Sequence, residues 1–378
     1  MLTSQRAAFD IPRDIAYLNA ASWSPLPRAV QDAGRAGVAR KGQPWLIDAA
    51  FARAQHERAR AAAARLINAD PEDIALVSSV GYGVATAAKV LALPAGARVL
   101  VLADDHSSPV LEWRSRAGLV VDVVGPPPDG DWTAALLAAI ARPGAPPALA
   151  SISSVHWADG GLIDLARVAP ALRACGAALL VDATHHVGVL PTDVRTLDPD
   201  FLVFPTYKWV LGPYGRAFLY VAKRRQDGVP LEQTSYGRRA VAAEVVPYMK
   251  DTAYVAGARR FDMGERDHFI SLEMAAVGME MIAAWGVAAI EPRLAMLTAQ
   301  LAEGLAHPKV RLPDPRLRAP HVLSLAFPEG WPHGLVERLA DAGAHAALRQ
   351  DRLRISPHVY NDETDVERFV AAFRAVMG

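Results

Sequence analysis

The sequence predicts an α/β fold, with a mostly parallel sheet of about seven strands sandwiched by helices and a smaller α+β domain at the C-terminus. Short, nearly continuous apolar runs alternate with helical segments up to about residue 240, and the pattern then changes to long helices. At 378 residues the chain also exceeds the roughly 250–300 residues that one core usually holds. We therefore expect a large domain at 16–258 and a small domain that consists of residues 259–378 together with residues 1–15.

The large domain is predicted from the order of its apolar runs. Strands are expected at 73–79, 97–103, 147–155, 177–183, 200–205 and 215–222. Helices rich in Ala are expected between them, at 52–67, 132–141, 164–175 and in the segment "GVATAAKVLAL". Only a short, turn-rich connection separates the last two strands, so we expect these two to run antiparallel.

The small domain is predicted from two helical patterns and two short apolar runs. The helical stretch "FISLEMAAVGMEMIAAWG" continues into "VAAIEPRLAMLTAQLAEGL", and we expect interruptions near Gly286 and Pro292. The runs "HVLSLAF" and "RLRIS" predict strands, and each precedes a segment with helical periodicity. This order is typical of an α+β domain.

Composition excludes several classes of protein. Forty basic side chains balance 40 acidic ones, which gives no field to attract nucleic acid or an anionic membrane. Cys175 is the only cysteine, so neither an intrachain disulfide nor a cysteine-based metal site is expected. The apolar runs are far shorter than the ~20 residues that span a bilayer, and the first residues do not resemble a signal peptide. We expect a cytoplasmic protein with no metal, nucleic-acid or membrane partner.

Two side chains with chemical potential follow neighbouring predicted strands. Asp182 closes the run "AALLVDA", and Lys208 lies just after "DFLVFP". Ligands of parallel α/β sheets bind beyond the carboxyl ends of the strands, so we expect a carboxylate and an amine at the same edge. A buried carboxylate needs a partner such as a protonated ring nitrogen, and a dehydrated amine becomes nucleophilic. Asp182 as a helix cap or an arginine partner, and Lys208 as a surface lysine, are the structural alternatives.

Three further positions suggest a bound anion or a flat ligand. Ser79 and Gly81 lie between a strand and a helix, where backbone N–H groups can hold a phosphate. His106 follows the strand 97–103 and could stack on a flat ligand, although a loop histidine is more often solvated. Arg354 lies in a short apolar strand, which suits either a bidentate grip on a carboxylate or an internal ion pair.

The segments "LLVDATHHVGVLPTDV" and "YKWVLGPYG" resemble the Asp-x-x-Gln and Lys-x-x-x-Gly-Pro-x-Gly motifs of the class V aminotransferase family. The resemblance extends from "YLNAASWSPLP" (17–27) to "ISPHVYNDETDVERF" (355–369). This family has the aspartate-aminotransferase-like fold type I and uses pyridoxal 5'-phosphate. Its members include cysteine desulfurases, kynureninase and proteins similar to isopenicillin N epimerase. The resemblance therefore implies pyridoxal phosphate as the cofactor.

The resemblance also implies roles for the catalytic residues. Lys208 would form the Schiff base with the cofactor and move the proton at the substrate Cα. Asp182 would keep the pyridine nitrogen protonated, and His106 would stack on the ring. His185 stands where the family usually has a Gln that faces the ring oxygen, which is a departure from the family pattern.

Further cofactor and substrate positions follow from the same resemblance. The remaining cofactor-binding positions are Ser79, Val80, Gly81, Thr206 and Tyr207, although the Thr that is frequent in the first loop of the family is absent here. Arg354 matches the arginine that binds the α-carboxylate, which implies an amino-acid substrate. Asn19 and Trp157 are expected to contact the substrate as well, and Trp157 stands near an Asn of the desulfurases.

A homodimer is implied by the segment "RRFDMGERD" (259–267). It resembles the family segment that reaches the phosphate of the neighbouring subunit. Residues near Gly264 are therefore expected to reach the partner's active site, with Glu265 in a position where Thr is frequent.

The favoured reaction is that of an aminotransferase acting on an amino acid. A C–S lyase or desulfurase-like enzyme, or an epimerase, is the alternative among enzymes. The desulfurases need a mobile cysteine in the C-terminal half, and residues 176–378 contain none. A ligand-sensing protein without turnover is the alternative outside enzymes, but the complete set of Asp182, Lys208 and Arg354 argues against it.

Overall fold

The computed structural model describes residues 2–378 and contains a seven-stranded, mostly parallel sheet, which confirms the predicted fold class. All neighbouring strands are parallel except β8, which runs antiparallel to both β2 and β7, as the short connection predicts. From one edge to the other the order is β2 (Ile74–Val77), β8 (Ala217–Val221), β7 (Phe201–Pro205), β6 (Ala178–Asp182), β5 (Leu149–Ser153), β3 (Arg98–Leu102) and β4 (Val120–Val124).

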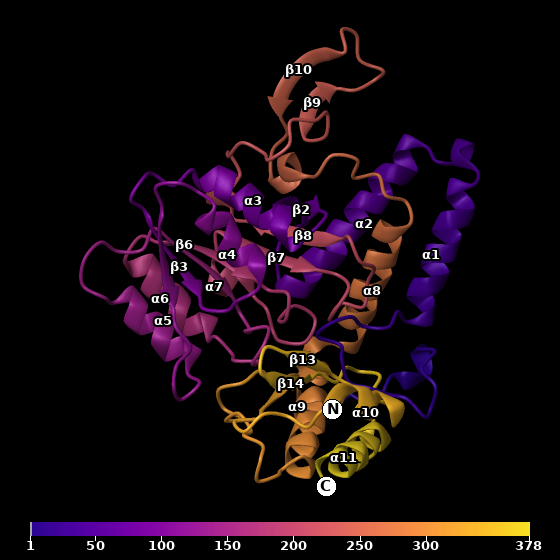
Figure 1. Cartoon of the computed structure of the whole chain (residues 1–378). Coiled ribbons are helices and arrows are strands. Elements are labelled where there is room, and N and C mark those ends of the chain that lie inside the picture. The colour runs from indigo at the N-terminus through magenta and orange to yellow at the C-terminus, as the bar shows by residue number, and fades with distance from the viewer. Residues whose placement is uncertain (1) are drawn as a thin grey trace.

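Helices cover both faces of this sheet (Figure 1). One face packs on α3 (Val80–Leu91) and α4 (Ser107–Arg114), whose Val84 and Trp113 join Leu180 in one buried cluster. The other face carries Leu179 and Val181 into a second, larger cluster. The helices of that side are α2 (Ala49–Ile67), α5 (Trp132–Ile140), α6 (Leu165–Ala174), the short α7 (Val194–Leu197) and α8 (Ser271–Trp285), and α1 (Arg28–Lys41) packs on α8.

Polar caps fix where several helices begin. The Ser79 hydroxyl accepts a hydrogen bond from the Tyr82 N–H, so α3 starts at Val80. Gly81, which was expected between the strand and the helix, therefore lies in the first turn of the helix. The aspartates that cap α2, α5, α6, α7 and α11 are Asp48, Asp131, Asp164, Asp193 and Asp362.

The two long helices of the C-terminal half meet at a sharp bend of 81° between α8 and α9 (Val287–Gly304). Gly286 lies at the bend with φ of +80°, as the sequence predicts. Pro292, the second expected interruption, instead lies inside α9 without ending it. No single helix among residues 2–378 is long and apolar enough to cross a membrane; α8 and α9 pass that test only as a bent pair.

A small three-stranded sheet forms the core of the C-terminal part, in the order β11 (Leu323–Ala326), β14 (Arg352–Ile355) and β13 (Ala347–Arg349). Helix α9 packs on β11, and α11 (Glu363–Met377) packs on both α9 and α10 (Leu335–Asp341). Because α8 packs against α1 and α2, it couples this part to the large sheet. The domain boundary at residue 258 remains a prediction.

The first residues of the chain join the C-terminal part. Strand β1 (Ala16–Tyr17) pairs in parallel with β12 (Ala344–His345). Arg6 forms a buried ion pair with Asp365 on α11, at 2.7 Å. Both ends of the chain consequently lie on the same side of the molecule in Figure 1.

A hairpin of β9 (Arg238–Val241) and β10 (Met249–Tyr254) projects away from the large sheet (Figure 1). Neither the hairpin nor β4 was predicted from the sequence. Short 3₁₀ helices complete the fold at Arg6–Ala8, Pro44–Leu46, Pro71–Asp73, Lys223–Arg225 and Ala258–Phe261.

Candidate active site

The ends of β6 and β7 place a carboxylate and an amine in one pocket. The two strands are parallel neighbours, with Asp182 opposite Val203. Asp182 is the last residue of β6, and Lys208 follows the end of β7 by three residues, 208 − 205. Both side chains line the same pocket of about 190 Å³. They meet beyond the carboxyl ends of these parallel strands, where ligands of α/β sheets are expected to bind.

Most of the predicted site residues line this pocket. The ones that the structure brings together are Ser79, Val80, Gly81, His106, Trp157, Asp182, His185, Tyr207 and Lys208. Thr206, Asn19 and Arg354 do not line it. The Thr206 hydroxyl instead donates to the Pro213 carbonyl at 2.6 Å and so holds the loop after Lys208.

The Asp182 carboxylate is half satisfied. Its Oδ1 accepts hydrogen bonds from the backbone N–H, at 2.9 Å, and from the hydroxyl of Thr184. Within residues 2–378 no group donates to Oδ2, and Asp182 forms no ion pair with an arginine. The side chain is nevertheless buried, with 4% exposure. Oδ2 is therefore available to a donor from a ligand, such as a protonated ring nitrogen.

Lys208 is not a surface lysine, because only 7% of it is exposed. Burial is the main cause that lowers the pKa of its amine to about 7; the nearby Arg354 guanidinium acts in the same direction, and Asp182 opposes both. At neutral pH a large fraction of the amine is therefore uncharged and can act as a nucleophile or a base.

His185 connects Lys208 to the core. Its Nε2 lies 3.3 Å from the Lys208 Nζ, and its Nδ1 accepts a hydrogen bond from the Trp209 indole N–H at 3.0 Å. Burial, with the positive charge of Lys208 as the next cause, holds the pKa of His185 well below its usual value. The ring is therefore neutral under physiological conditions. The adjacent His186 faces elsewhere, and its Nε2 lies 3.1 Å from the Pro191 carbonyl.

His106 precedes α4 and keeps an exposed ring beside the pocket. It meets Trp157 edge to face, with ring centroids 6.0 Å apart and an interplanar angle of 88°. Within the described chain no side-chain hydrogen bond holds this imidazole. Its face is consequently free to stack on a flat ligand.

The opposite end of the pocket suits a phosphate. The N–H groups of Val80 and Gly81 at the start of α3 have no acceptor among the described residues. Such groups, together with the helix dipole, attract anions. Tyr207 and Tyr214 meet beside them with ring centroids 4.2 Å apart. Arg216 also lines this pocket, and the sequence analysis did not identify it.

A second, arginine-rich position lies next to Trp157. Arg354 is 1% exposed, donates to the Trp157 carbonyl and to the Ser22 hydroxyl, and has no carboxylate partner in residues 2–378. Burial lowers its pKa to about 9. Arg349 donates to the same hydroxyl, at 2.7 Å, and Asn19 accepts from it. Two guanidinium groups without an anion favour a carboxylate ligand here over an internal ion pair.

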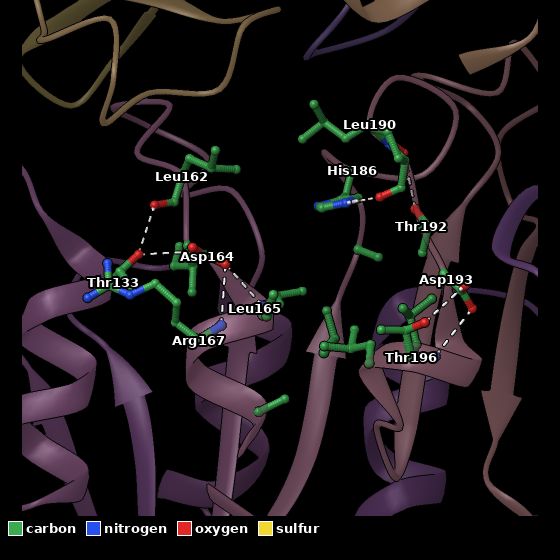
Figure 2. Close-up of a pocket in the computed structure, with 18 of the residues that line it drawn as sticks. Thr133, Leu162, Asp164, Leu165, Arg167, His186, Leu190, Thr192, Asp193 and Thr196 are labelled. Atoms are coloured by element: carbon green, nitrogen blue, oxygen red, sulfur yellow. Dashed lines mark hydrogen bonds between the residues drawn. The ribbon is translucent and has the colours of Figure 1, made fainter. Parts of the chain in front are cut away.

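A larger cavity, of about 590 Å³, lies on the opposite face of β6 (Figure 2). Successive strand side chains point to opposite faces, so Val181 and Ala183 line this cavity while Asp182 lines the smaller pocket. Figure 2 shows His186 at its wall, hydrogen-bonded to the loop that leads to α7. Asp182 and Lys208 therefore lie in the smaller pocket, and not in this larger cavity.

Comparison with known proteins identifies the family of the chain. The family model described as "Aminotransferase class-V" matches residues 17–369. The protein called "Uncharacterized aminotransferase YcbU" of Bacillus subtilis is 27% identical and aligns with 92% of this chain and 89% of its own. Isopenicillin N epimerase of Streptomyces clavuligerus is 28% identical, with 96% and 95% covered. Kynureninases and probable cysteine desulfurases are further relatives.

A solved structure supports the fold. A mutant of the protein C-DES, with glycine covalently linked to its PLP cofactor, aligns with a TM-score of 0.85 at 20% identity and covers 98% of this chain and 99% of that one. The fold is thus that of the pyridoxal-phosphate-dependent enzymes of this type. The chain belongs to the class V aminotransferase family. Family membership supports pyridoxal phosphate as the cofactor.

Proposed function

We propose that this protein is a pyridoxal-phosphate-dependent enzyme that acts on an amino acid, with an aminotransferase-like reaction. The observation that carries the proposal is the pocket shared by a buried Lys208, whose pKa is lowered to about 7, and a carboxylate with one free oxygen. Pyridoxal phosphate bound there would supply a ring that accepts the electrons released when a Cα bond of the substrate breaks.

Each residue has a task in this proposal. The free Oδ2 of Asp182 would hold the ring nitrogen in its protonated form, and the exposed face of His106 would stack on the ring. The amine of Lys208 would attach the cofactor and then carry the Cα proton. Arg354, with Arg349 beside it, would grip the substrate carboxylate in the two-pronged manner of a guanidinium. Trp157 would shape the wall between these two positions, since its carbonyl accepts from Arg354.

The position of Cys175 argues against a sulfur carrier. This cysteine caps the end of α6, donates to the Leu172 carbonyl and is absent from the pocket that contains Lys208. Cys175 precedes the first residue of β6 and so lies at the end of that strand opposite to the one where Asp182 meets Lys208. Elimination without a persulfide, epimerisation and transamination remain chemically open to the residues of the pocket.

The substitution Lys208→Ala tests the cofactor assignment. We expect the purified protein to carry the visible absorbance band of lysine-bound pyridoxal phosphate and the variant to lose it, because no other amine lines the pocket among the described residues. Lys89→Ala is the matched control, since this half-buried lysine bonds only to the Leu231 carbonyl. A visible band that survives in the Lys208 variant would refute the assignment.

Product analysis distinguishes the candidate reactions. The purified protein is incubated with a panel of amino acids, and keto acid, sulfide and racemised amino acid are measured separately. Keto acid that forms only when an acceptor is present supports the aminotransferase. Sulfide would instead indicate a C–S lyase, and racemised amino acid would indicate an epimerase. A change in the cofactor spectrum without any product would indicate a sensor.

We further propose that the enzyme is a homodimer in which residues near Gly264 reach the partner's active site. Three exposed apolar side chains cluster on the projecting hairpin, Val246, Tyr248 and Met249. The Glu232 carboxylate accepts from the Gly264 N–H and so ties this segment to the loop preceding the hairpin. A second copy of the chain would cover the apolar tip.

A further inference from the structure

Arg216 stands at the edge of the large sheet, directly before β8. The first residue of that strand, Ala217, pairs with Val77 at the end of β2 and with Pro205 at the end of β7. The Arg216 carbonyl accepts the backbone N–H of Thr206 at 3.0 Å. Arg216 is therefore fixed between the two strand ends that lead into the phosphate end of the pocket, and it lines that pocket together with Ser79 and Gly81.

The guanidinium of Arg216 is buried without an anion. The residue is 4% exposed, its Nε donates to the Ser271 hydroxyl at 2.7 Å, and its Nη1 contacts the Met263 sulfur at 3.7 Å. Both partners are neutral, and the described chain offers Arg216 no ion pair. Burial lowers its pKa to about 10, so it keeps its charge at physiological pH. A buried charge without a partner is unfavourable, and its place in this pocket points to an anion that the polypeptide itself does not supply.

The surroundings define the kind of anion. The unbonded N–H groups of Val80 and Gly81 begin α3, and Ser78 and Ser108 also line this pocket. The Arg216 Nη2 makes no hydrogen bond within residues 2–378, and solvent can reach it. A helix N-terminus, hydroxyl groups and one guanidinium make a site for a phosphate monoester.

We propose that Arg216 binds the phosphate of pyridoxal phosphate and supplies its main positive charge. The loop before α3 lacks the Thr that is frequent in the family, and Gly81 offers no side chain, so the charge of Arg216 would replace missing hydroxyl contacts. This inference rests on the cofactor alone. It holds whichever amino-acid reaction the enzyme catalyses.

The test compares two probes that differ only in the phosphate. Affinities of pyridoxal phosphate and of pyridoxal are measured by fluorescence titration of the full-length, cofactor-stripped chain, for the natural protein and for Arg216→Met. We expect the Arg216→Met variant to bind pyridoxal phosphate about 10- to 100-fold more weakly, which corresponds to the loss of hydrogen bonds to a charged group. Its affinity for pyridoxal should not change. Arg216→Lys should fall between the two, because a point charge cannot reproduce the guanidinium fork.

Arg318→Met is the matched control. Arg318 is also buried, bonds only to the neutral Thr298 hydroxyl and to backbone carbonyls, and lies outside the pocket. It should leave both affinities unchanged even where it lowers stability. Equal losses for the two probes in Arg216→Met, or no loss for pyridoxal phosphate, would refute the proposal.

A second measurement needs no substitution. Phosphorus NMR follows the cofactor phosphate bound to the natural protein from about pH 5 to about pH 8, a range that includes the second pKa of a free phosphate ester near 6. A phosphate held by Arg216 and α3 stays dianionic, so its signal should not move over this range. A signal that titrates as in free solution would show that no cation holds the phosphate.

Discussion

The indole N–H of Trp209 fixes the tautomer of His185, that is, which of its ring nitrogens carries the proton. An indole N–H can only donate, so the His185 Nδ1 that it contacts must be the unprotonated nitrogen, and the ring proton resides on Nε2. That Nε2–H points at the Lys208 nitrogen, 3.3 Å away. The contact is favourable only when Lys208 is neutral and offers its lone pair, which agrees with a pKa of about 7. Trp209 thus positions a hydrogen-bond donor at the centre of the pocket.

Trp209→Phe should release this tautomer. The ring of Phe keeps most of the buried contact but cannot donate, so the proton of His185 can move to Nδ1. In nitrogen-15 NMR spectra of the cofactor-free chain, the signals of a fixed Nε2–H tautomer should give way to averaged ones. His185→Gln, which should remove those signals altogether, assigns them.

Trp113→Phe is the control for that experiment. Trp113 is 1% exposed, like Trp209, but its indole N–H has no partner, and as a residue of α4 it packs on the other face of the sheet. The control should leave the histidine signals as they are. An unchanged His185 spectrum in Trp209→Phe would mean that another contact fixes the tautomer.

The sequence analysis identified the site residues that lie just after strands. It missed the residues whose role depends on contacts with distant parts of the chain. Asp182 and Lys208 were predicted to meet because neighbouring parallel strands end at one edge. Arg216, Arg349 and Trp209 carried no such local signal. Arg216 follows a glycine-rich turn and was interpreted only as part of a strand, because the sequence does not reveal that the anion beside a buried arginine is missing.

At the scale of elements, α8 holds the loop that follows Lys208. Gly278 lets this helix approach the loop so closely that a Cβ atom there would lie 2.5 Å from the Val210 carbonyl oxygen and 3.0 Å from the Leu211 backbone. Backbone atoms cannot rotate away as a side chain can. The position of the Lys208 loop therefore depends on a helix that also leads into the C-terminal part of the chain.

Gly278→Ala should destabilise the protein by about 1–3 kcal/mol, because the added methyl group forces α8 off the loop. Gly34→Ala is the matched control within α1, where the nearest atom, 2.9 Å away, is the flexible Met274 sulfur. An alanine there should be neutral or stabilising by up to about 1 kcal/mol. Urea unfolding of the cofactor-free variants measures both, and equal stabilities would contradict the close-packing account.

The sequence predicted strands well where every residue of the strand is buried, and less well for strands at the edge of a sheet. The five-residue strands in the middle of the sheet are buried throughout, which gives the continuous apolar runs recognised in the sequence. Strand β4 lies at the edge with exposed Val120 and was missed, and β9 and β10 are stabilised mainly by each other. Pro292 was expected to end a helix, but α9 continues past it because packing of Leu294 and Leu297 in the core outweighs one lost backbone hydrogen bond.

At the scale of the whole molecule, the hairpin tip is the test of the proposed dimer. Val246, Tyr248 and Met249 are 87%, 52% and 65% exposed, which is unusual for apolar side chains gathered at one protrusion. Changing all three to Ser should shift the protein from dimer to monomer in sedimentation experiments at micromolar concentration. Val120→Ser, at an exposed valine of the edge strand β4, should not. A dimer that withstands the triple change would place the interface elsewhere.

The pairing of β1 with β12, and of Arg6 with Asp365, has a consequence for synthesis of the protein. The first residues leave the ribosome long before their partners, which are encoded more than 300 positions later. While the nascent large sheet can already assemble around its own helices, the leading segment must wait unpaired. Closure of so long a loop is slow, so we expect chaperones to encounter this segment exposed until β12 and Asp365 have been synthesised.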